Sequence, residues 1–206
     1  MRDLYFFGAA ALISVVMISG AMAFDPRTEA TAPLSVGTGE RNYISVTGQD
    51  LNRIRQARRD TVTLIREKEG QTFLRITSRR NGDLPTAAKD VAYLPISTDL
   101  QLAFAEQNLK ITISARSAPL NGSPAMRLQY SSGSDGNSDW RSFLLTPEWE
   151  DYSFYYTPPP SKGDLGLDFF AVWADPDGLG RGVEIRNLVF DTRLQRTPAE
   201  ELKTAD

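Results

Sequence analysis

Cysteine and histidine are both absent from the 206 residues of the sequence. Without cysteine, disulfide bridges, zinc–thiolate sites, iron–sulfur clusters and thiol catalysis are excluded. Without histidine, the Ser-His-Asp and Cys-His catalytic arrangements, the HExxH metalloproteases and an imidazole base acting near neutral pH are excluded. Any chemistry therefore depends on carboxylates, Lys, Arg, Tyr, hydroxyl groups or the backbone, and we predict no metal site and no cofactor.

An excess of basic charge is also lacking. The chain has 23 basic and 26 acidic residues, which gives a net charge of −3 at pH 7. Recognition of nucleic acid calls for a concentrated basic face, so nucleic acid is not an expected partner. Hydrophobic residues make up 41% of the chain, charged residues 24% and aromatic residues 10%, which is the composition of an ordinary globular domain.

The longest apolar run lies at the N-terminus. Residues 4–23 are almost all apolar or small, follow a charged start and close on Ala21-Met22-Ala23. These features are typical of a signal peptide, so we predict that residues 1–23 are cleaved. The mature protein would then be extracytoplasmic, periplasmic or secreted, with no membrane span. The alternative is that the same segment stays attached as a single membrane anchor.

The rest of the chain divides into three parts. Residues 24–41 are mostly Pro, Thr, Ala, Gly and Ser, which predicts a flexible linker, and residues 192–206 form a polar tail. The folded body is expected at residues 42–191. Within it, only residues 49–59 have helical spacing, with Leu51 and Ile54 near one face and Asp50 placed to cap the start.

Elsewhere in the folded body, apolar residues recur with a period of two. This period predicts strands at residues 61–66, 72–77, 100–104, 109–115, 125–130, 140–145, 152–157, 165–174 and 182–190. Turn-forming residues such as Asn121-Gly122 separate many of them. Eight or nine short strands with almost no helix between them predict an all-β fold, an antiparallel β-sandwich or jelly roll.

Alternation assigns each strand a core face and an opposite face. In residues 109–116, Ile111 and Ile113 point to the core while Arg116 points away from it. The same rule gives core positions to Ala115, Met126, Leu128, Tyr130, Tyr152, Phe154 and Tyr156, and opposite positions to Arg127, Gln129 and Tyr155. A sheet face of hydroxyls, amides and arginine with a few aromatics suits sugars, whose rings stack and whose hydroxyls bond. The alternative is an ordinary solvated outer face.

Five residues are the candidates for ligand binding: Trp173, Tyr155, Arg116, Arg127 and Gln129. Trp173 ends a stretch that is apolar on both faces, so it is either a core residue or a stacking platform. Arg116 and Arg127 could bind the carboxylates of an acidic polysaccharide through bidentate hydrogen bonds, or could balance acidic side chains at the surface.

Residues 92–191 resemble carbohydrate-binding modules of the galactose-binding-like jelly-roll group. The resemblance is carried by an ordered series of segments: Leu109-Lys-Ile-Thr-Ile-Ser-Ala-Arg116, Trp140-Arg-Ser-Phe-Leu-Leu-Thr-Pro-Glu-Trp149, Tyr152-Ser-Phe-Tyr-Tyr156 and Gly182-Val-Glu-Ile-Arg-Asn-Leu-Val-Phe190. It implies a non-catalytic module that binds polysaccharide, with Trp140 and Trp149 in packing positions. It does not carry over the family's structural calcium, because Arg186-Asn187 stands where the family commonly has an acidic residue followed by Asp or Asn, and an arginine repels a divalent cation.

Three functions follow from these observations. The first is an exported, non-catalytic carbohydrate-binding module or one associated with cell-envelope polysaccharide. The second is a structural β-sandwich of the envelope that binds a protein partner and no sugar. The third is an enzyme that cleaves glycans with a carboxylate pair, for instance Glu148 or Glu150 with Asp168, which would need the two groups close together in a cleft. We expect the protein not to be an enzyme.

Overall fold

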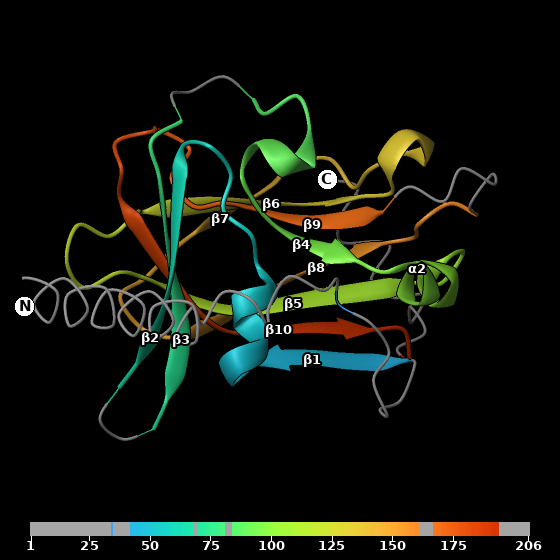
Figure 1. Ribbon diagram of the computed structural model, residues 1–206, viewed down its shortest axis with the longest axis horizontal. Coiled ribbons are helices and arrows are strands. Elements are labelled where there is room, and N and C mark those ends of the chain that lie inside the picture. Colours follow the sequence, from blue (N-terminus) through green and yellow to red (C-terminus); the bar gives the residue numbers. More distant parts are fainter. Residues whose placement is uncertain (1–33, 35–41, 68–69, 81–83, 161–166, 194–206) are drawn as a thin grey trace, which may run out of the picture. The chain divides into compact units, whose positions relative to one another are not determined.

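The computed structural model describes residue 34 and residues 42–67, 70–80, 84–160 and 167–193, and these form two stacked antiparallel sheets (Figure 1). Sheet A has the strand order β4-β9-β6-β7, and sheet B has the order β2-β3-β10-β5-β8 with β1 also on β10. The strands of sheet A are β4 (Ala92–Ile96), β6 (Ala125–Ser131), β7 (Arg141–Leu144) and β9 (Asp168–Trp173). Those of sheet B are β1 (Tyr43–Thr47), β2 (Asp60–Arg66), β3 (Thr72–Ser78), β5 (Leu109–Ser117), β8 (Glu150–Tyr156) and β10 (Gly182–Asp191). The predicted all-β sandwich is therefore confirmed.

The core lies between the two sheets, as the alternation predicts. Ile111 and Ile113 of β5 are fully buried there, and so are Met126, Leu128 and Tyr130 of β6. Aromatic rings fill the centre: Phe190 stacks on Phe104 with ring centroids 5.7 Å apart and meets Phe170 edge-to-face at 5.7 Å. Because the chain has no cysteine, this packed interior is the main source of its stability.

A β-bulge in β10 explains the shape of sheet B. The register of β10 against β5 shifts between Ile185 and Asn187, which leaves Arg186 as the extra residue. The part of β10 before the bulge pairs with β3, and the part after the bulge pairs with β1. The same edge of β10 therefore forms hydrogen bonds with two different strands. Bulges bend and twist a strand, and Figure 1 shows β2 and β3 running across the direction of β1 and the second part of β10.

The predicted helix at residues 49–59 is wrong in type and length. The structure has a 3-10 helix, η1 (Gly48–Arg53), followed by extended backbone at Ile54. Arg55 then forms an antiparallel bridge with Tyr93 of β4, so pairing with sheet A ends the helix. Asp50 does not cap the start either, because its carboxylate accepts a hydrogen bond from Arg53 Nε at 3.0 Å.

The predicted strand at residues 100–104 is an α-helix, α2 (Thr98–Phe104). Leu100 and Phe104 are fully buried while Leu102 is 60% exposed. Leu100 and Phe104 are four residues apart, a spacing that places them on one helical face, and alternation alone cannot distinguish this from a strand. The strand β1 was not predicted, and neither was β4, an edge strand that accommodates Pro95.

The predicted signal segment 1–23 lies outside the described residues, and so does most of the predicted linker and tail. At Leu34, inside the predicted linker, the chain forms a parallel bridge with Ile96, and the Leu34 side chain is buried. The linker is therefore held against the edge of sheet A at this position. Among the described residues, no helix has the length and hydropathy needed to span a bilayer.

Candidate functional site

The five predicted ligand-binding residues are divided between the two outer faces of the sandwich. Arg127, Gln129 and Trp173 lie on the outer face of sheet A, where Arg127 pairs with Trp173 across β6 and β9. Arg116 and Tyr155 lie on the outer face of sheet B, on the neighbouring strands β5 and β8. A single small ligand cannot contact both groups, because the whole core separates them.

Trp173 has a packing role in this structure. Its side chain is fully buried, with Trp140 edge-to-face at 5.9 Å between ring centroids and the Arg127 guanidinium 5.1 Å from the ring centroid. Ala88 and Val91, from the segment that crosses sheet A, complete the cluster. The ring thus has no exposed face on which a sugar could stack, and Trp140 is the half-buried indole next to it.

Arg116 is engaged by groups of the protein itself. Its Nε donates to Glu184 Oε2 at 2.7 Å, and Arg75 Nε donates to Glu184 Oε1 at 3.0 Å. The Arg116 guanidinium also lies 4.4 Å from the centroid of the Trp149 ring, and Arg186 lies 5.1 Å from the same ring. We refer to Arg75, Arg116 and Glu184 as the arginine–glutamate triad. The carboxylate that Arg116 binds therefore belongs to the protein itself and not to a ligand. Trp149 packs against arginine side chains, in line with the packing position that the resemblance implies.

A groove on the outer face of sheet A brings together side chains suited to a sugar. It has a volume of about 480 Å³ and is lined by strand residues Gln129, Ser131 and Phe169. Its other sides are the 84–89 segment and residues of the connection between β6 and β7, including Asn137, Asp139 and Trp140. We call this the sheet A groove. Of the five predicted residues, Gln129 is the one that lines it.

Hydrogen bonds hold the β6–β7 connection in the shape that forms the groove. This connection contains the 3-10 helix η3 (Gly133–Asp135). Ser138 Oγ accepts a hydrogen bond from the Tyr130 amide at 2.9 Å, and Asn137 Oδ1 accepts from the Asp139 amide at 2.9 Å and from Gln129 Nε2 at 3.3 Å. Asp139 has φ +56°, a left-handed conformation that Asp tolerates better than most residues. The polar side chains are therefore preorganised.

The opposite wall of the groove is fixed at its base by Asp90, in the 3-10 helix η2 (Ala88–Asp90). Burial acts to raise the pKa of this carboxyl, but hydrogen bonds from the Ala87 amide at 3.0 Å and the Thr86 hydroxyl at 2.9 Å, together with nearby Arg80, outweigh it. The pKa of Asp90 is therefore lowered. The ionised carboxylate holds the backbone of this wall through its hydrogen bonds to Thr86 and Ala87. Thr86, Ala87 and Lys89 thereby line the groove.

The sequence analysis did not identify Trp140, Asn137, Asp139 or Phe169 as groove residues. The signal that could have found them is the polar, glycine-containing stretch 133–139 directly before Trp140. An exposed polar loop beside an aromatic residue is a common way to form a binding site. The 84–91 segment covers Trp173 through contacts between residues far apart in the sequence, and local sequence pattern does not predict such contacts.

Comparisons with solved structures find carbohydrate-binding modules among the similar chains. The C-terminal family 22 carbohydrate-binding module of Clostridium thermocellum Xyn10B is 17% identical, with 78% of this chain and 91% of that chain covered and a TM-score of 0.43. The family 11 carbohydrate-binding module of Clostridium thermocellum, in complex with a β-1,3-1,4-mixed-linked tetrasaccharide, is 14% identical, with 79% and 96% covered and a TM-score of 0.40. The fold is similar to that of jelly-roll carbohydrate-binding modules.

No family model matches the sequence, and no curated protein matches it. This chain spans only about a quarter of two larger structures that it resembles. The first is the structure of the Clostridium thermocellum N-terminal endo-1,4-β-D-xylanase 10B modules complexed with xylohexaose, which is 11% identical. The match covers 76% of this chain and 27% of that chain, with a TM-score of 0.42. The second is an arabinose-bound MgGH51 α-L-arabinofuranosidase, which is 12% identical. The match covers 74% of this chain and 26% of that chain, with a TM-score of 0.46.

The carboxylates considered for glycan cleavage lie in different environments. Asp168 of β9 is 1% exposed and accepts hydrogen bonds from Tyr130 Oη at 2.7 Å and Gln101 Nε2 at 2.8 Å. Glu148 and Glu150 are exposed, next to and at the start of β8 in the other sheet. Asp168 is enclosed by the protein, so a substrate at the surface does not reach it.

Asp175 and Asp177 bind an arginine and are not arranged as oxygen ligands of a metal ion. Arg181 donates from its amide to Asp175 Oδ2 at 3.0 Å and from Nε to Oδ1 at 3.1 Å, and it also pairs with Asp177. The Gly178 amide donates to the Asp175 carbonyl at 3.0 Å, which closes a turn at residues 175–178. Within the described segments, no group of three or more acidic side chains is arranged to hold a metal ion.

Burial of Asp168 gives a prediction for pH dependence. Burial raises the pKa of Asp168 above its ordinary value, with hydrogen bonds from Tyr130 and Gln101 opposing this in part. A raised carboxyl pKa stabilises the fold when the group is protonated, and that contribution is lost as pH rises through the folded pKa. The Asp168→Asn variant removes the titrating carboxyl and can keep the hydrogen bond to Gln101. Gln101 Oε1 lacks a partner among the described residues, and after rotation of the Gln101 amide group it accepts from the Asn side-chain NH2.

Urea unfolding of both proteins between about pH 4 and pH 7 tests this prediction. We expect the free energy of unfolding of the native protein, relative to Asp168→Asn, to fall as pH rises. Every other titrating group is common to both proteins and cancels in the difference. Parallel pH profiles would contradict the raised pKa of Asp168.

Proposed function

We propose that this chain is an exported, non-catalytic carbohydrate-binding module whose sugar site is the sheet A groove. The observation that carries the proposal is the set of side chains in that groove. The half-buried rings of Trp140 and Phe169 offer apolar surface, and Gln129, Asn137 and Asp139 place amide and carboxylate groups beside them. A few directed polar groups around an aromatic surface are what a sugar ring requires, because it has C–H faces to stack and hydroxyls to bond.

The volume and rigidity of the groove support the same proposal. About 480 Å³ falls within the range of small-molecule binding sites. The hydrogen bonds around Asn137 and Asp90 hold the two walls before a ligand arrives, which reduces the entropy lost on binding.

Titration calorimetry and affinity electrophoresis of the full chain with neutral oligosaccharides and polysaccharides test the proposal. We expect binding by the native protein, and binding at least about tenfold weaker for Trp140→Leu because the stacking surface is reduced. Gln129→Ala is expected to weaken binding by about three- to tenfold through loss of a hydrogen bond. Tyr155→Ala, on the outer face of sheet B, is the matched aromatic control and should leave affinity unchanged.

The outcomes separate the alternatives. Binding that is lost with Tyr155→Ala and kept with Trp140→Leu would move the site to sheet B. Failure of every neutral glycan to bind the native protein, together with recovery of a stable protein complex by pull-down, would favour the partner-binding function. Export is tested on the same protein, because its N-terminal residue outside the cytoplasm should be Phe24. Met1 at that position would contradict cleavage.

A further inference from the structure

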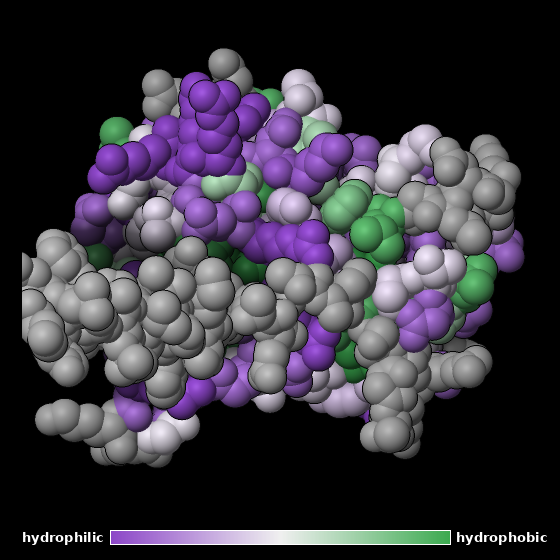
Figure 2. Space-filling view, in the orientation of Figure 1, coloured by the Kyte–Doolittle hydropathy of each residue, from purple (hydrophilic) through white to green (hydrophobic). Residues whose placement is uncertain are grey.

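A second concavity, at one end of the β2–β3 hairpin, has three arginines among its seven lining residues. Its volume is about 670 Å³, and its lining includes Arg58, Arg59 and Arg79 with Thr61 and Thr77. We call these five residues the arginine pocket. Figure 2 shows strongly hydrophilic side chains gathered over this end of the hairpin. The pocket is on sheet B and is separate from the sheet A groove.

Backbone hydrogen bonds join the chain segments that form the arginine pocket. The Arg79 amide donates to the Arg59 carbonyl at 3.0 Å, and the Gly180 amide donates to the Ser78 carbonyl at 2.9 Å. Gly180 has φ +76°, and a Cβ placed there would lie 3.2 Å from Arg79 Nε. The Arg79 side chain therefore lies directly against the Gly180 backbone, which limits where its guanidinium can go.

Among the described residues, no carboxylate forms an ion pair with the arginines of this pocket. Within the described part of the chain, Arg58, Arg59 and Arg79 form no ion pair, whereas Arg75, Arg116, Arg181 and Arg193 each bind a carboxylate. Arg58, Arg59 and Arg79 are all exposed, and they place three positive charges at one pocket of a chain whose net charge is −3. Their mutual repulsion is relieved when an anion binds among them.

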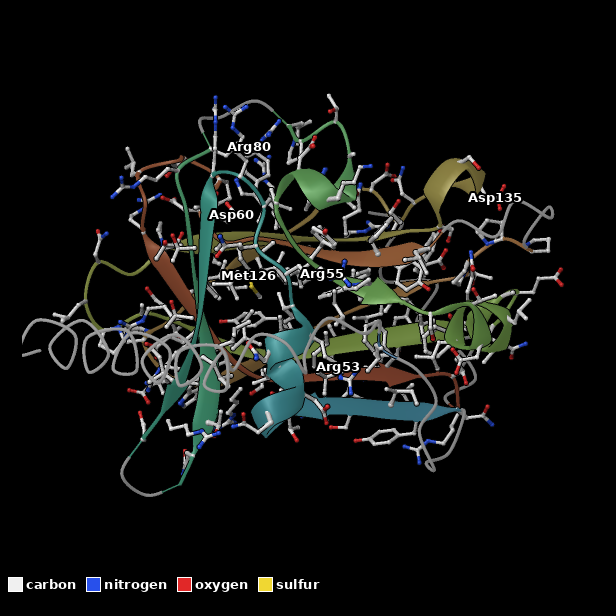
Figure 3. The ribbon with its side chains drawn as sticks, viewed as in Figure 1. Arg53, Arg55, Asp60, Arg80, Met126 and Asp135 are labelled. Carbon is white, nitrogen blue, oxygen red and sulfur yellow. The ribbon has the colours of Figure 1, made fainter. Side chains whose placement is uncertain are left out.

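Asp60 also lines the pocket, and among the described residues no ion pair joins its carboxylate to Arg58, Arg59 or Arg79. It is only 5% exposed, and burial raises its pKa. Arg80 is the basic residue whose charge lowers that pKa in part, and Figure 3 shows Asp60 and Arg80 at the same end of the hairpin. Arg80 is thus the arginine that acts on the buried carboxyl, and the three pocket arginines are not paired with it.

We propose that the arginine pocket binds the carboxylate or sulfate groups of an acidic polysaccharide. A guanidinium group presents paired N–H donors that match the two oxygens of such an anion, and it stays charged at every physiological pH. The hydroxyls of Thr61 and Thr77, which face each other across β2 and β3, are placed to bond the sugar that carries the anion. This site extends the protein beyond binding of neutral glycans at the sheet A groove.

The test measures binding of the full chain to polygalacturonate, dextran sulfate, neutral dextran and inorganic sulfate. Single substitutions Arg58→Gln, Arg59→Gln and Arg79→Gln are expected to weaken binding of the two acidic polymers by about tenfold each, and the triple variant by more. Arg66→Gln, at the other end of β2, is the matched control and should change affinity less than about twofold. Binding by the native protein should weaken as salt is raised.

Other results would overturn the proposal. These are retention of acidic-polymer binding by the triple variant, binding of inorganic sulfate without either polymer, and binding of anionic phospholipid vesicles in preference to the polymers. Thermal unfolding of each variant confirms that it is folded. Neutral-glycan binding, measured in parallel, should be unaffected by the triple variant, so the failure of this proposal is distinguishable from failure of the sheet A groove.

Discussion

Replacement of Glu184 by alanine is expected to lower the free energy of unfolding by about 3 to 5 kcal/mol. The Glu184 side chain is fully buried, and its two carboxylate oxygens are held by Arg75 and Arg116. Alanine would leave both guanidinium groups without the carboxylate that compensates their desolvation. It would also release Arg116 from its position over the Trp149 ring, to which it is fixed at 4.4 Å. Urea unfolding at neutral pH measures the loss.

Two further variants show that the loss comes from uncompensated charge. The Arg75→Met/Arg116→Met/Glu184→Leu variant removes the whole triad and should recover much of the stability, because burial of apolar groups of similar volume often replaces a buried ion pair without cost. Glu150→Ala, at an exposed carboxylate of the same sheet, should change the free energy of unfolding by no more than about 0.5 kcal/mol. An effect of Glu184→Ala as small as that of Glu150→Ala would show that the triad does not stabilise the fold.

The strands that are most accessible to sequence reasoning are those in which apolar side chains alternate strictly. Ile111 and Ile113 in β5, and Met126 and Leu128 in β6, identify both the strand and its buried face. The pairing of β10 with both β3 and β1 could not be predicted, because it depends on a bulge at Arg186 that no local pattern marks. Local pattern therefore predicts strands and faces, and the order of strands within a sheet requires the structure.

The same limit applies to the candidate sites. Gln129 was predicted from alternation and does line the sheet A groove, because a polar residue opposite a core position must face outward. Trp173 also faces outward, yet the 84–91 segment and Arg127 cover it. Arg116 was chosen for its outward position, but its partner Glu184 is far away in sequence. Whether an outward residue is free to bind a ligand depends on contacts between distant segments.

Gly122→Ala is expected to destabilise the protein by about 3 kcal/mol or more. A Cβ at this position would lie 2.1 Å from Ser117 Oγ and 2.3 Å from the Ala118 carbonyl oxygen. The 118–123 segment is anchored to the start of β10, since the Ala118 and Ser123 amides both donate to the Gly182 carbonyl, at 3.1 and 2.9 Å. To relieve the clash, the backbone must move and these hydrogen bonds must lengthen.

Two controls separate this clash from other effects of adding a methyl group. Gly48 has φ +56° with nothing within 4 Å of a Cβ, so Gly48→Ala should cost only about 1 kcal/mol from left-handed backbone. Gly122 is not in that region, so its loss must come from contact. Ser117→Ala removes one clashing atom and cannot remove the Ala118 carbonyl. The Ser117→Ala/Gly122→Ala variant should therefore stay less stable than Ser117→Ala alone, and full rescue would show that the backbone contact has no energetic weight.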